Sequence, residues 1–222
     1  MTDLPAAYVF DAYGTLFDVH SAVRKHAKEV GPDAAALSDL WRTKQLEYTW
    51  VRTLMGRYVD FWEITQQALD FAFTSFPEAD VNTRADLLDA YWELEAYGEV
   101  RDVLQRLQAT GAKTAIFSNG SPDMLAAAVA SADLDNVLDA SISVHRLQQF
   151  KTSPSVYQLV CDEFDAQPEK VSFQSSNRWD IAGAKAFRFR TVWCNRTGQP
   201  DEYADLTPDR VISDLTELVT EL

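Results

Sequence analysis

The chain has 222 residues, a length that suits one domain carrying a sizeable insert. Hydrophobic residues make up 46 % and charged residues 24 %, which is typical of a well-packed globular protein and excludes a chain that is disordered throughout. The formal net charge of −14 repels phosphate backbones, so nucleic acid is not an expected partner.

The N-terminal segment MTDLPAAYVFDAYG has no basic region, and its apolar run is too short for a signal peptide. No stretch of the chain approaches the roughly 18 apolar residues that a bilayer span requires. The two cysteines, Cys161 and Cys194, lie in apolar runs and have no metal or redox spacing. We therefore expect a cytoplasmic protein that does not interact with membranes.

A short β-like run over 7–10 ends abruptly at Asp11. From Ser21 to about Tyr97 the pattern is helical, with Ser21 as the expected N-cap and Gly31 as the expected C-terminal stop of the first helix. Apolar and aromatic residues at helical spacing predict further helices over 40–55 and 58–73. No convincing strand occurs here, so this block is expected to be a helical insert.

After about Gly98 the expected strands alternate with helices. The strands are predicted over 113–117, 140–144, 171–173 and 191–194, and the helices over 100–107, 123–132, 157–164, 181–187 and 214–222. Ser121-Pro122 and Ser153-Pro154 each combine an N-cap residue with proline at the first helical position. The alternation predicts an α/β fold with a doubly wound parallel sheet, a Rossmann-like core of 1–16 and 98–222 that carries an inserted helical cap subdomain over 17–97.

Ligands of such sheets bind beyond the carboxyl ends of the strands. The side chains that follow the expected strands include two carboxylates, a lysine and several neutral hydrogen-bonding groups: Asp11, Thr15, Ser118, Asn119, Lys151, Ser175, Asn177 and Asp180. This set suits a hydrolase that forms a covalent intermediate on a carboxylate. Taken singly, Asp11 also suits a turn residue and Lys151 a solvated cation.

Six segments in order carry a family resemblance: FDAYGTLFDVHSAV (10–23), LWRTKQLEYTW (40–50), LMGRYVDFW (54–62), FSNGSPDML (117–125), FKTSPSVYQL (150–159) and SSNRWDIAGAKAF (175–187). The chain resembles the haloacid dehalogenase superfamily and, within it, the L-2-haloacid dehalogenases. The resemblance implies a hydrolytic enzyme that converts short-chain (S)-2-haloacids into (R)-2-hydroxy acids and halide through an aspartyl ester.

The resemblance also implies a role for each site residue. Asp11 is the nucleophile, Lys151 keeps it ionised, and Asp180 is the best candidate for the base that activates water, aided by Ser175 and Asn177. Ser118 and nearby backbone amides hold the substrate carboxylate, while Arg42 and Asn119 receive the halide. The remaining implied site residues complete the catalytic turn or contact the substrate: Ala12, Tyr13, Thr15, Leu46, Phe61, Tyr157 and Trp179.

Two positions depart from the phosphatases of this superfamily. Tyr13 stands where a phosphatase has a second Asp as general acid, and a halide leaving group needs no proton. The last motif offers Ser175, Ser176 and Asn177, leaving Asp180 as its only carboxylate for a hard dication. We therefore expect no metal and no cofactor.

Two positions depart from the dehalogenases. Thr152-Ser153 follows Lys151 where Pro and an Asp or His are usual, and Thr43 follows Arg42 where a longer Gln is common, which is expected to enlarge the pocket. The open alternatives are a Mg²⁺-dependent phosphatase, a hydrolase of fluoroacetate or a strained ring amine, and an inactive cap-bearing interaction protein. The aromatic-rich cap helices further predict a homodimer.

Overall fold

The computed structural model describes residues 5–220 and contains a six-stranded sheet in the order β3-β2-β1-β4-β5-β6. All neighbouring strands are parallel. The strands are β1 (Ala7–Phe10), β2 (Lys113–Ser118), β3 (Ala140–Ser143), β4 (Val171–Ser175), β5 (Arg190–Cys194) and β6 (Arg210–Ile212). The order reverses between β1 and β4, so the predicted doubly wound α/β core is confirmed, and the crevice beyond these strands is the expected ligand site.

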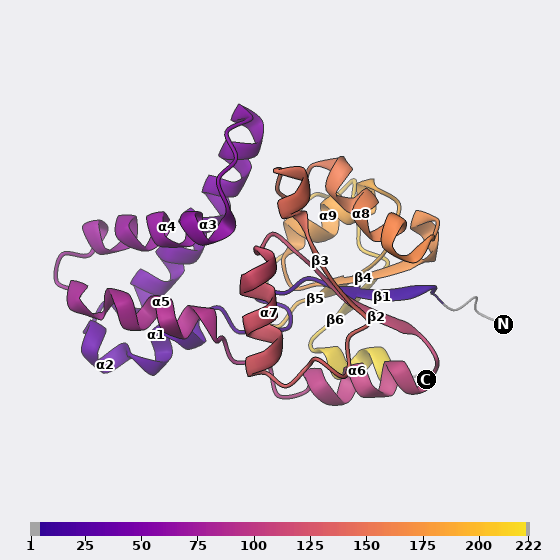
Figure 1. Cartoon of the computed structure of the whole chain (residues 1–222), viewed down its shortest axis with the longest axis horizontal. Helices are drawn as coiled ribbons and strands as arrows, with labels where there is room; N and C mark the ends of the chain where they lie inside the picture. Colours follow the sequence, from indigo (N-terminus) through magenta and orange to yellow (C-terminus); the bar gives the residue numbers. More distant parts are fainter. Residues whose placement is uncertain (1–4, 221–222) are drawn as a thin grey trace.

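Helices cover both faces of this sheet. In Figure 1, α8 and α9 lie on one face and α6 lies on the other, against the C-terminal η4. The elements are α6 (Val100–Ala109), α7 (Pro122–Ser131), η2 (Val144–Leu147), α8 (Pro154–Phe164), η3 (Pro168–Lys170), α9 (Arg178–Ala186) and η4 (Leu215–Val219). The central strand β1 is buried along its whole length, as an apolar parallel strand between two helical layers must be.

The segment between β1 and α6 is helical and projects to one side of the sheet (Figure 1). It consists of α1 (Ser21–Lys25), α2 (Ala27–Val30), α3 (Ala34–Met55), α4 (Phe61–Ser75), η1 (Val81–Thr83) and α5 (Arg84–Trp92). Its entering and leaving ends lie side by side, because Tyr97 N donates to Leu16 O at 2.9 Å and Asp18 N donates to Glu95 O at 2.8 Å. The exact boundaries at 16–17 and 97–98 stay a prediction.

Three local predictions are wrong. Ser21 is not an N-cap: His20 occupies that position, and the buried Ser21 Oγ instead accepts a hydrogen bond from Glu95 N. The expected single helix over 21–31 is two short helices that meet at His26, the second of which ends at Gly31 as predicted. The segment 214–222 forms a 3₁₀ turn over Leu215–Val219 where a longer helix was predicted, and 221–222 lie outside the described residues.

The sequence pattern also missed β6, because three residues at a sheet edge are too short to show an alternation. Ser121 caps α7 as predicted, since its side chain accepts from Met124 N. Ser153 precedes α8 but makes no capping bond there; its hydroxyl donates to Gln149 Oε1 instead. None of these differences moves the carboxyl ends of β1, β2 and β4, where the proposed site residues lie.

Candidate active site

Asp11 follows β1 directly and is 5 % exposed. One of its oxygens, Oδ2, accepts from three neutral donors: Asn177 Nδ2 at 2.7 Å, Thr15 Oγ1 at 3.1 Å and Ser175 Oγ at 3.3 Å. The other oxygen, Oδ1, accepts from Lys151 Nζ at 3.1 Å. The carboxylate is therefore anchored through Oδ2, and Oδ1 is the oxygen that is better placed to attack a substrate carbon.

The turn after Asp11 contains Ala12, which is fully buried, and Gly14, which has φ +91°. The carbonyl of Ala12 accepts from the amides of Thr15 and Leu16, so the backbone folds tightly around the carboxylate. A side chain at Gly14 would be strained in this left-handed conformation. The turn brings the Thr15 hydroxyl back to Asp11, four residues earlier.

Lys151 lies in the loop that leads from η2 to α8 and is 1 % exposed. Its three ammonium hydrogens have three acceptors: Asp11 Oδ1 at 3.1 Å, Asp180 Oδ2 at 2.7 Å and Phe117 O at 2.7 Å. The rings of Phe117 and Phe173 lie 4.4 and 5.1 Å from Nζ and shield it from water. Lys151 therefore bridges two buried carboxylates, which explains a lysine just before a helix start.

Asp180 is fully buried in the first turn of α9. Burial raises the pKa of Asp180 to about 6, although the Lys151 ammonium acts in the opposite direction. Tyr157 donates its hydroxyl to Asp180 Oδ1 at 2.8 Å. The structure thus places Tyr157 behind Asp180, among the rings of Phe117, Phe173 and Phe187, which suits positioning of the carboxylate better than the substrate contact expected from the resemblance.

Ser118 ends β2, Asn119 follows it directly, and both are buried beside Lys151. Gly120 N donates to Ser118 Oγ at 3.0 Å, so the hydroxyl hydrogen of Ser118 can point to another acceptor. Asn119 Oδ1 accepts from the backbone amide of Lys151 at 2.9 Å, which leaves Nδ2 as the group that can donate to an anion. Both arrangements suit donation to a bound anionic substrate or product.

Arg42 on α3 is the cation that the cap brings to this site. Its NH2 nitrogen donates to Tyr13 O at 3.0 Å and to Asn177 Oδ1 at 3.4 Å, and its NH1 nitrogen donates to Gln45 Oε1 at 2.7 Å. Because Asn177 also binds Asp11, Arg42 is two hydrogen bonds from the carboxylate. Arg42 therefore places a second positive charge, besides that of Lys151, where the cap meets the core.

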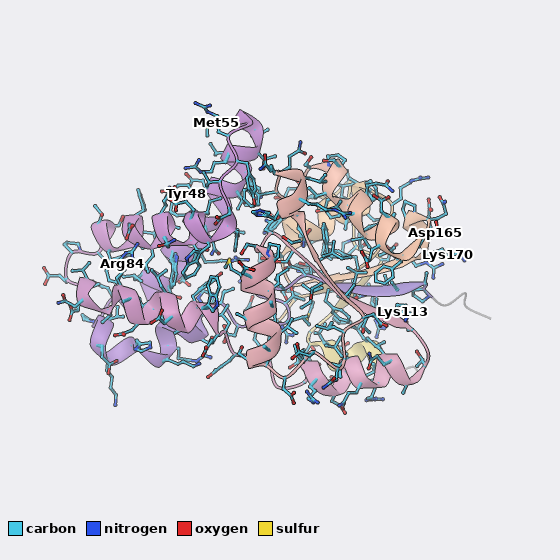
Figure 2. All side chains as sticks on the ribbon, in the orientation of Figure 1. Tyr48, Met55, Arg84, Lys113, Asp165 and Lys170 are labelled. Atoms are coloured by element: carbon cyan, nitrogen blue, oxygen red, sulfur yellow. The ribbon has the colours of Figure 1, made fainter. Side chains whose placement is uncertain are left out.

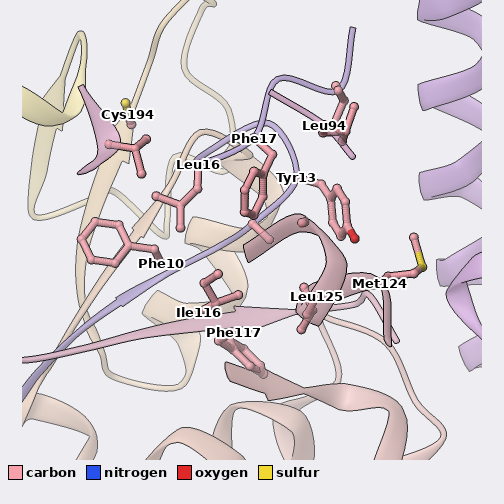
Figure 3. Packing of buried hydrophobic residues seen from close by; sticks show 14 of the residues in the cluster. Phe10, Tyr13, Leu16, Phe17, Leu94, Ile116, Phe117, Met124, Leu125 and Cys194 are labelled. Carbon is pink, nitrogen blue, oxygen red and sulfur yellow. The ribbon is translucent and has the colours of Figure 1, made fainter. Parts of the chain in front are cut away.

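Aromatic rings form the wall next to Asp11. Tyr13 is 4 % exposed, and its ring lies 5.5 Å from Phe61 and 5.7 Å from Tyr91, stacked on the latter. Figure 3 shows Tyr13 within the cluster of buried hydrophobic residues, on the side of Leu125 and Met124. Burial raises the pKa of Tyr13 well above its usual value, so this side chain is a very weak acid.

Leu46, Trp179 and Thr43 lie further out. Leu46 is half-buried one turn after Arg42, on the same side of α3. Trp179 packs edge-on against Trp50 of the cap, with the ring centroids 5.5 Å apart, and lines a cavity of about 430 Å³ whose lining does not include Asp11. Thr43 is exposed and its hydroxyl donates to Asp39 O of its own helix, so the expectation that it enlarges the pocket is wrong.

Three cap residues that the sequence analysis did not single out complete the surroundings of Arg42: Gln45, Thr65 and Tyr91. Gln45 was detectable only as a polar residue one turn from Arg42. No sequence pattern indicates that Gln45 binds residues 20 and 46 positions later. This network depends on how α3, α4 and α5 pack together.

A family model described as haloacid dehalogenase-like hydrolase matches residues 5–188. The chain is similar to (S)-2-haloacid dehalogenase 1 of Pseudomonas sp. (strain CBS-3), with 51 % identity over 96 % of this chain and 94 % of that protein. It is also similar to (S)-2-haloacid dehalogenase 4A of Burkholderia cepacia, with 47 % identity over 98 % and 95 %.

Solved structures of dehalogenases have the same fold as this chain. One crystal structure of a dehalogenase with an intermediate complex superimposes with a TM-score of 0.97 at 45 % identity, covering 100 % of this chain and 99 % of the other. The L-2-haloacid dehalogenase of Xanthobacter autotrophicus with chloropropionic acid covalently bound superimposes with a TM-score of 0.89 at 37 % identity, covering 97 % of each chain.

Proposed function

We propose that this chain, which belongs to the haloacid dehalogenase-like hydrolases, converts short-chain (S)-2-haloacids into (R)-2-hydroxy acids and halide. The observation that carries the proposal is the asymmetric environment of Asp11. Three neutral donors fix Oδ2, while Lys151 is the one partner of Oδ1 within residues 5–220. Such a carboxylate is oriented, with one oxygen directed toward a substrate.

In the first step, Asp11 Oδ1 attacks C2 of the substrate from the side opposite the halogen. The new C–O bond forms as the carbon–halogen bond breaks, and the halide leaves with the electron pair. Arg42 and Asn119 Nδ2 stabilise the departing anion, and Ser118 donates to the substrate carboxylate. Because this is the only displacement at C2, the configuration inverts once.

In the second step, water adds to Cγ of the Asp11 ester. Negative charge then develops on the former carbonyl oxygen, Oδ2, which already has hydrogen bonds from Thr15, Ser175 and Asn177. Asp180 accepts the proton of the attacking water. Breaking the bond from Cγ to the ester oxygen releases the hydroxy acid, whose alkoxide takes up the proton held by Asp180. The second proton of the water is lost to solvent, and Asp11 regains a carboxylate with one oxygen from water.

We propose that this reaction requires no metal ion or cofactor. Tyr13 occupies the position of the phosphatase acid, and within residues 5–220 no group of three or more His, Cys, Asp or Glu side chains is suited to hold a metal ion. The test is halide release from a panel of L- and D-2-haloacids, with and without EDTA. Release from the L-substrates that EDTA does not change supports the proposal; activity that appears only with added Mg²⁺ contradicts it and favours a phosphatase.

We further propose a homodimer that works in the cytoplasm. Val51, Leu54 and Met55 form an apolar stripe at the end of α3, where Leu54 is 87 % exposed, and Figure 2 shows Met55 at the outer tip of this helix. Both cysteines are free thiols, which suits a reducing compartment. No helix among the described residues is long and apolar enough to cross a membrane. Sedimentation equilibrium of the wild type and Leu54→Lys tests the dimer, which the substitution should dissociate.

A further inference from the structure

We propose that Gln45 is a positioning residue that fixes the guanidinium of Arg42 and leaves its positive charge available to the departing halide. The inference rests on the function proposed above, in which Arg42 receives the halide. Gln45 lies on α3, one turn after Arg42, and is 1 % exposed. Its Oε1 accepts from Arg42 NH1 at 2.7 Å.

The hydrogen bonds around Gln45 determine which way its carboxamide points. Thr65 donates its hydroxyl to Phe61 O at 2.7 Å, so its oxygen is an acceptor toward Gln45 Nε2, 2.8 Å away. Tyr91 OH lies 3.0 Å from Nε2 and 3.1 Å from Oε1. With the nitrogen facing Thr65, the oxygen necessarily faces Arg42. The orientation of the amide is thus set from α4, a different helix from the one that carries Arg42.

Arg42 is therefore held at two points of its planar head. Gln45 from the cap binds NH1, and Tyr13 O from the core binds NH2. A free arginine side chain samples many rotamers, and much of this freedom is already lost when the head is fixed before the substrate binds. The halide then meets a cation whose position needs no rearrangement during bond breaking, which is the condition for electrostatic stabilisation of a transition state.

The group that holds Arg42 in place must also be neutral. A carboxylate at position 45 would hold Arg42 at least as firmly, but its negative charge would offset the guanidinium charge that attracts the halide. A carboxamide accepts the same hydrogen bond and adds no net charge. This distinguishes the proposal from a purely structural role, for which glutamate would be an adequate or better substitute.

The experiment compares Gln45→Met, which removes both hydrogen-bonding groups, with Gln45→Glu, which keeps the acceptor and adds charge. For Gln45→Met we expect single-turnover ester formation to slow about tenfold, the loss of one charge-assisted hydrogen bond, with KM changed less than about twofold. For Gln45→Glu we expect product inhibition by bromide to weaken more than in Gln45→Met. Thermal unfolding and near-UV circular dichroism establish whether each variant folds. If Gln45→Glu does not fold, the rate of ester formation in Gln45→Met alone tests the positioning role.

Two matched controls come from the same pair of helices. Gln67 Oε1 accepts from Arg52 NH2 at 3.0 Å, a glutamine–arginine pair away from the site, so Gln67→Met should leave the rate unchanged. Thr65→Val should reproduce part of the Gln45→Met defect. Like Thr65, Thr74 donates its hydroxyl to a backbone carbonyl four residues earlier, but away from the site. Thr74→Val should therefore leave the rate unchanged.

A double-mutant cycle separates positioning from general support of the cap. If Gln45 acts through Arg42, then Gln45→Met should add little to the defect of Arg42→Ala. Full additivity, a normal rate for Gln45→Met, or bromide inhibition equal in Gln45→Glu and wild type would overturn the inference. If the wild type itself releases no halide, the proposed function fails. Bromide titration followed by the Arg42 side-chain NMR signal of wild type and Gln45→Met then decides the role of Gln45 independently.

Discussion

The two sides of the site are held by different physical means. On the core side, Lys151 is buried between the carboxylates of Asp11 and Asp180, and all three of its hydrogens are used. On the cap side, the half-buried Arg42 donates to neutral acceptors among the described residues, including a backbone carbonyl and two carboxamides. The difference follows the chemistry that each side is proposed to perform. A nucleophile has to be kept ionised and fixed, whereas a halide receptor has to keep its charge unpaired.

The largest effect is expected when the nucleophile on the core side is removed. Asp11→Asn preserves the shape of the side chain and removes the nucleophile, so halide release should fall by on the order of 10⁴-fold or more, as for other covalent nucleophiles. The unfolding temperature should remain close to that of the wild type. In single-turnover hydrolysis by the wild type in H₂¹⁸O, the label should enter Asp11 first. Label found directly in the first-turnover hydroxy acid would contradict an ester intermediate.

Loss of the core cation should come next. Two negative charges about 5 Å apart repel by roughly 3 kcal/mol at an effective dielectric of 20, and Lys151 offsets this repulsion between Asp11 and a substrate carboxylate. Through this repulsion, Lys151→Met should weaken substrate binding roughly a hundredfold. It should also slow ester formation, for a combined loss in kcat/KM of roughly a thousandfold.

Lys151→Arg should also be poor, because a planar guanidinium does not fit three acceptors around a compact ammonium. Because Lys151→Met leaves two buried carboxylates without a counter-ion, its unfolding temperature must be measured beside its activity. A folded Lys151→Met with nearly normal kcat/KM would disprove the charge-balance argument.

The cap side should respond more mildly and in one step only. Arg42→Ala should slow ester formation about a hundredfold, at the low end of the cost of removing a donor that faces developing charge. Hydrolysis of the preformed ester should hardly change, because the halide has already left. Rapid-quench measurement of both steps tests this separation, and an equal loss in both would show that the cap also governs the water reaction.

The smallest expected effect sharpens the comparison within the core. Burial raises the pKa of Asp180 to about 6, so its basic form is lost as the pH falls through that value, and ester hydrolysis should slow on the acidic side. The Tyr157 hydroxyl stabilises the ionised form, so Tyr157→Phe should raise this pKa further and move the acidic limb to higher pH by up to about one unit.

At pH well above both limbs, the Tyr157→Phe rate should approach that of the wild type. The matched control is Phe189→Leu, which alters another ring in contact with Tyr157 without touching the hydrogen bond. An unchanged pH profile for Tyr157→Phe would mean that Asp180 does not control ester hydrolysis.

The sequence by itself determined the side of the site that the sheet builds. Asp11, Ser118 and Ser175 follow or end buried strands, and parallel strands present their carboxyl ends at one edge whatever the details of packing. The order of the motifs therefore indicated the catalytic neighbourhood and, through the resemblance, the nucleophile. Local signals such as the Ser121 cap were equally readable, because a capping bond spans only three residues.

Only the tertiary structure decided what depends on side chains meeting across helices. Tyr157 lies behind Asp180 because α8 packs beside α9, and Gln45 meets Thr65 and Tyr91 because α3, α4 and α5 pack together. Helical periodicity tells which residues share a face, but the angle and register between two helices come from the packing of all their side chains. Tertiary packing alone therefore decides which side chain donates and which accepts in a hydrogen bond between two helices.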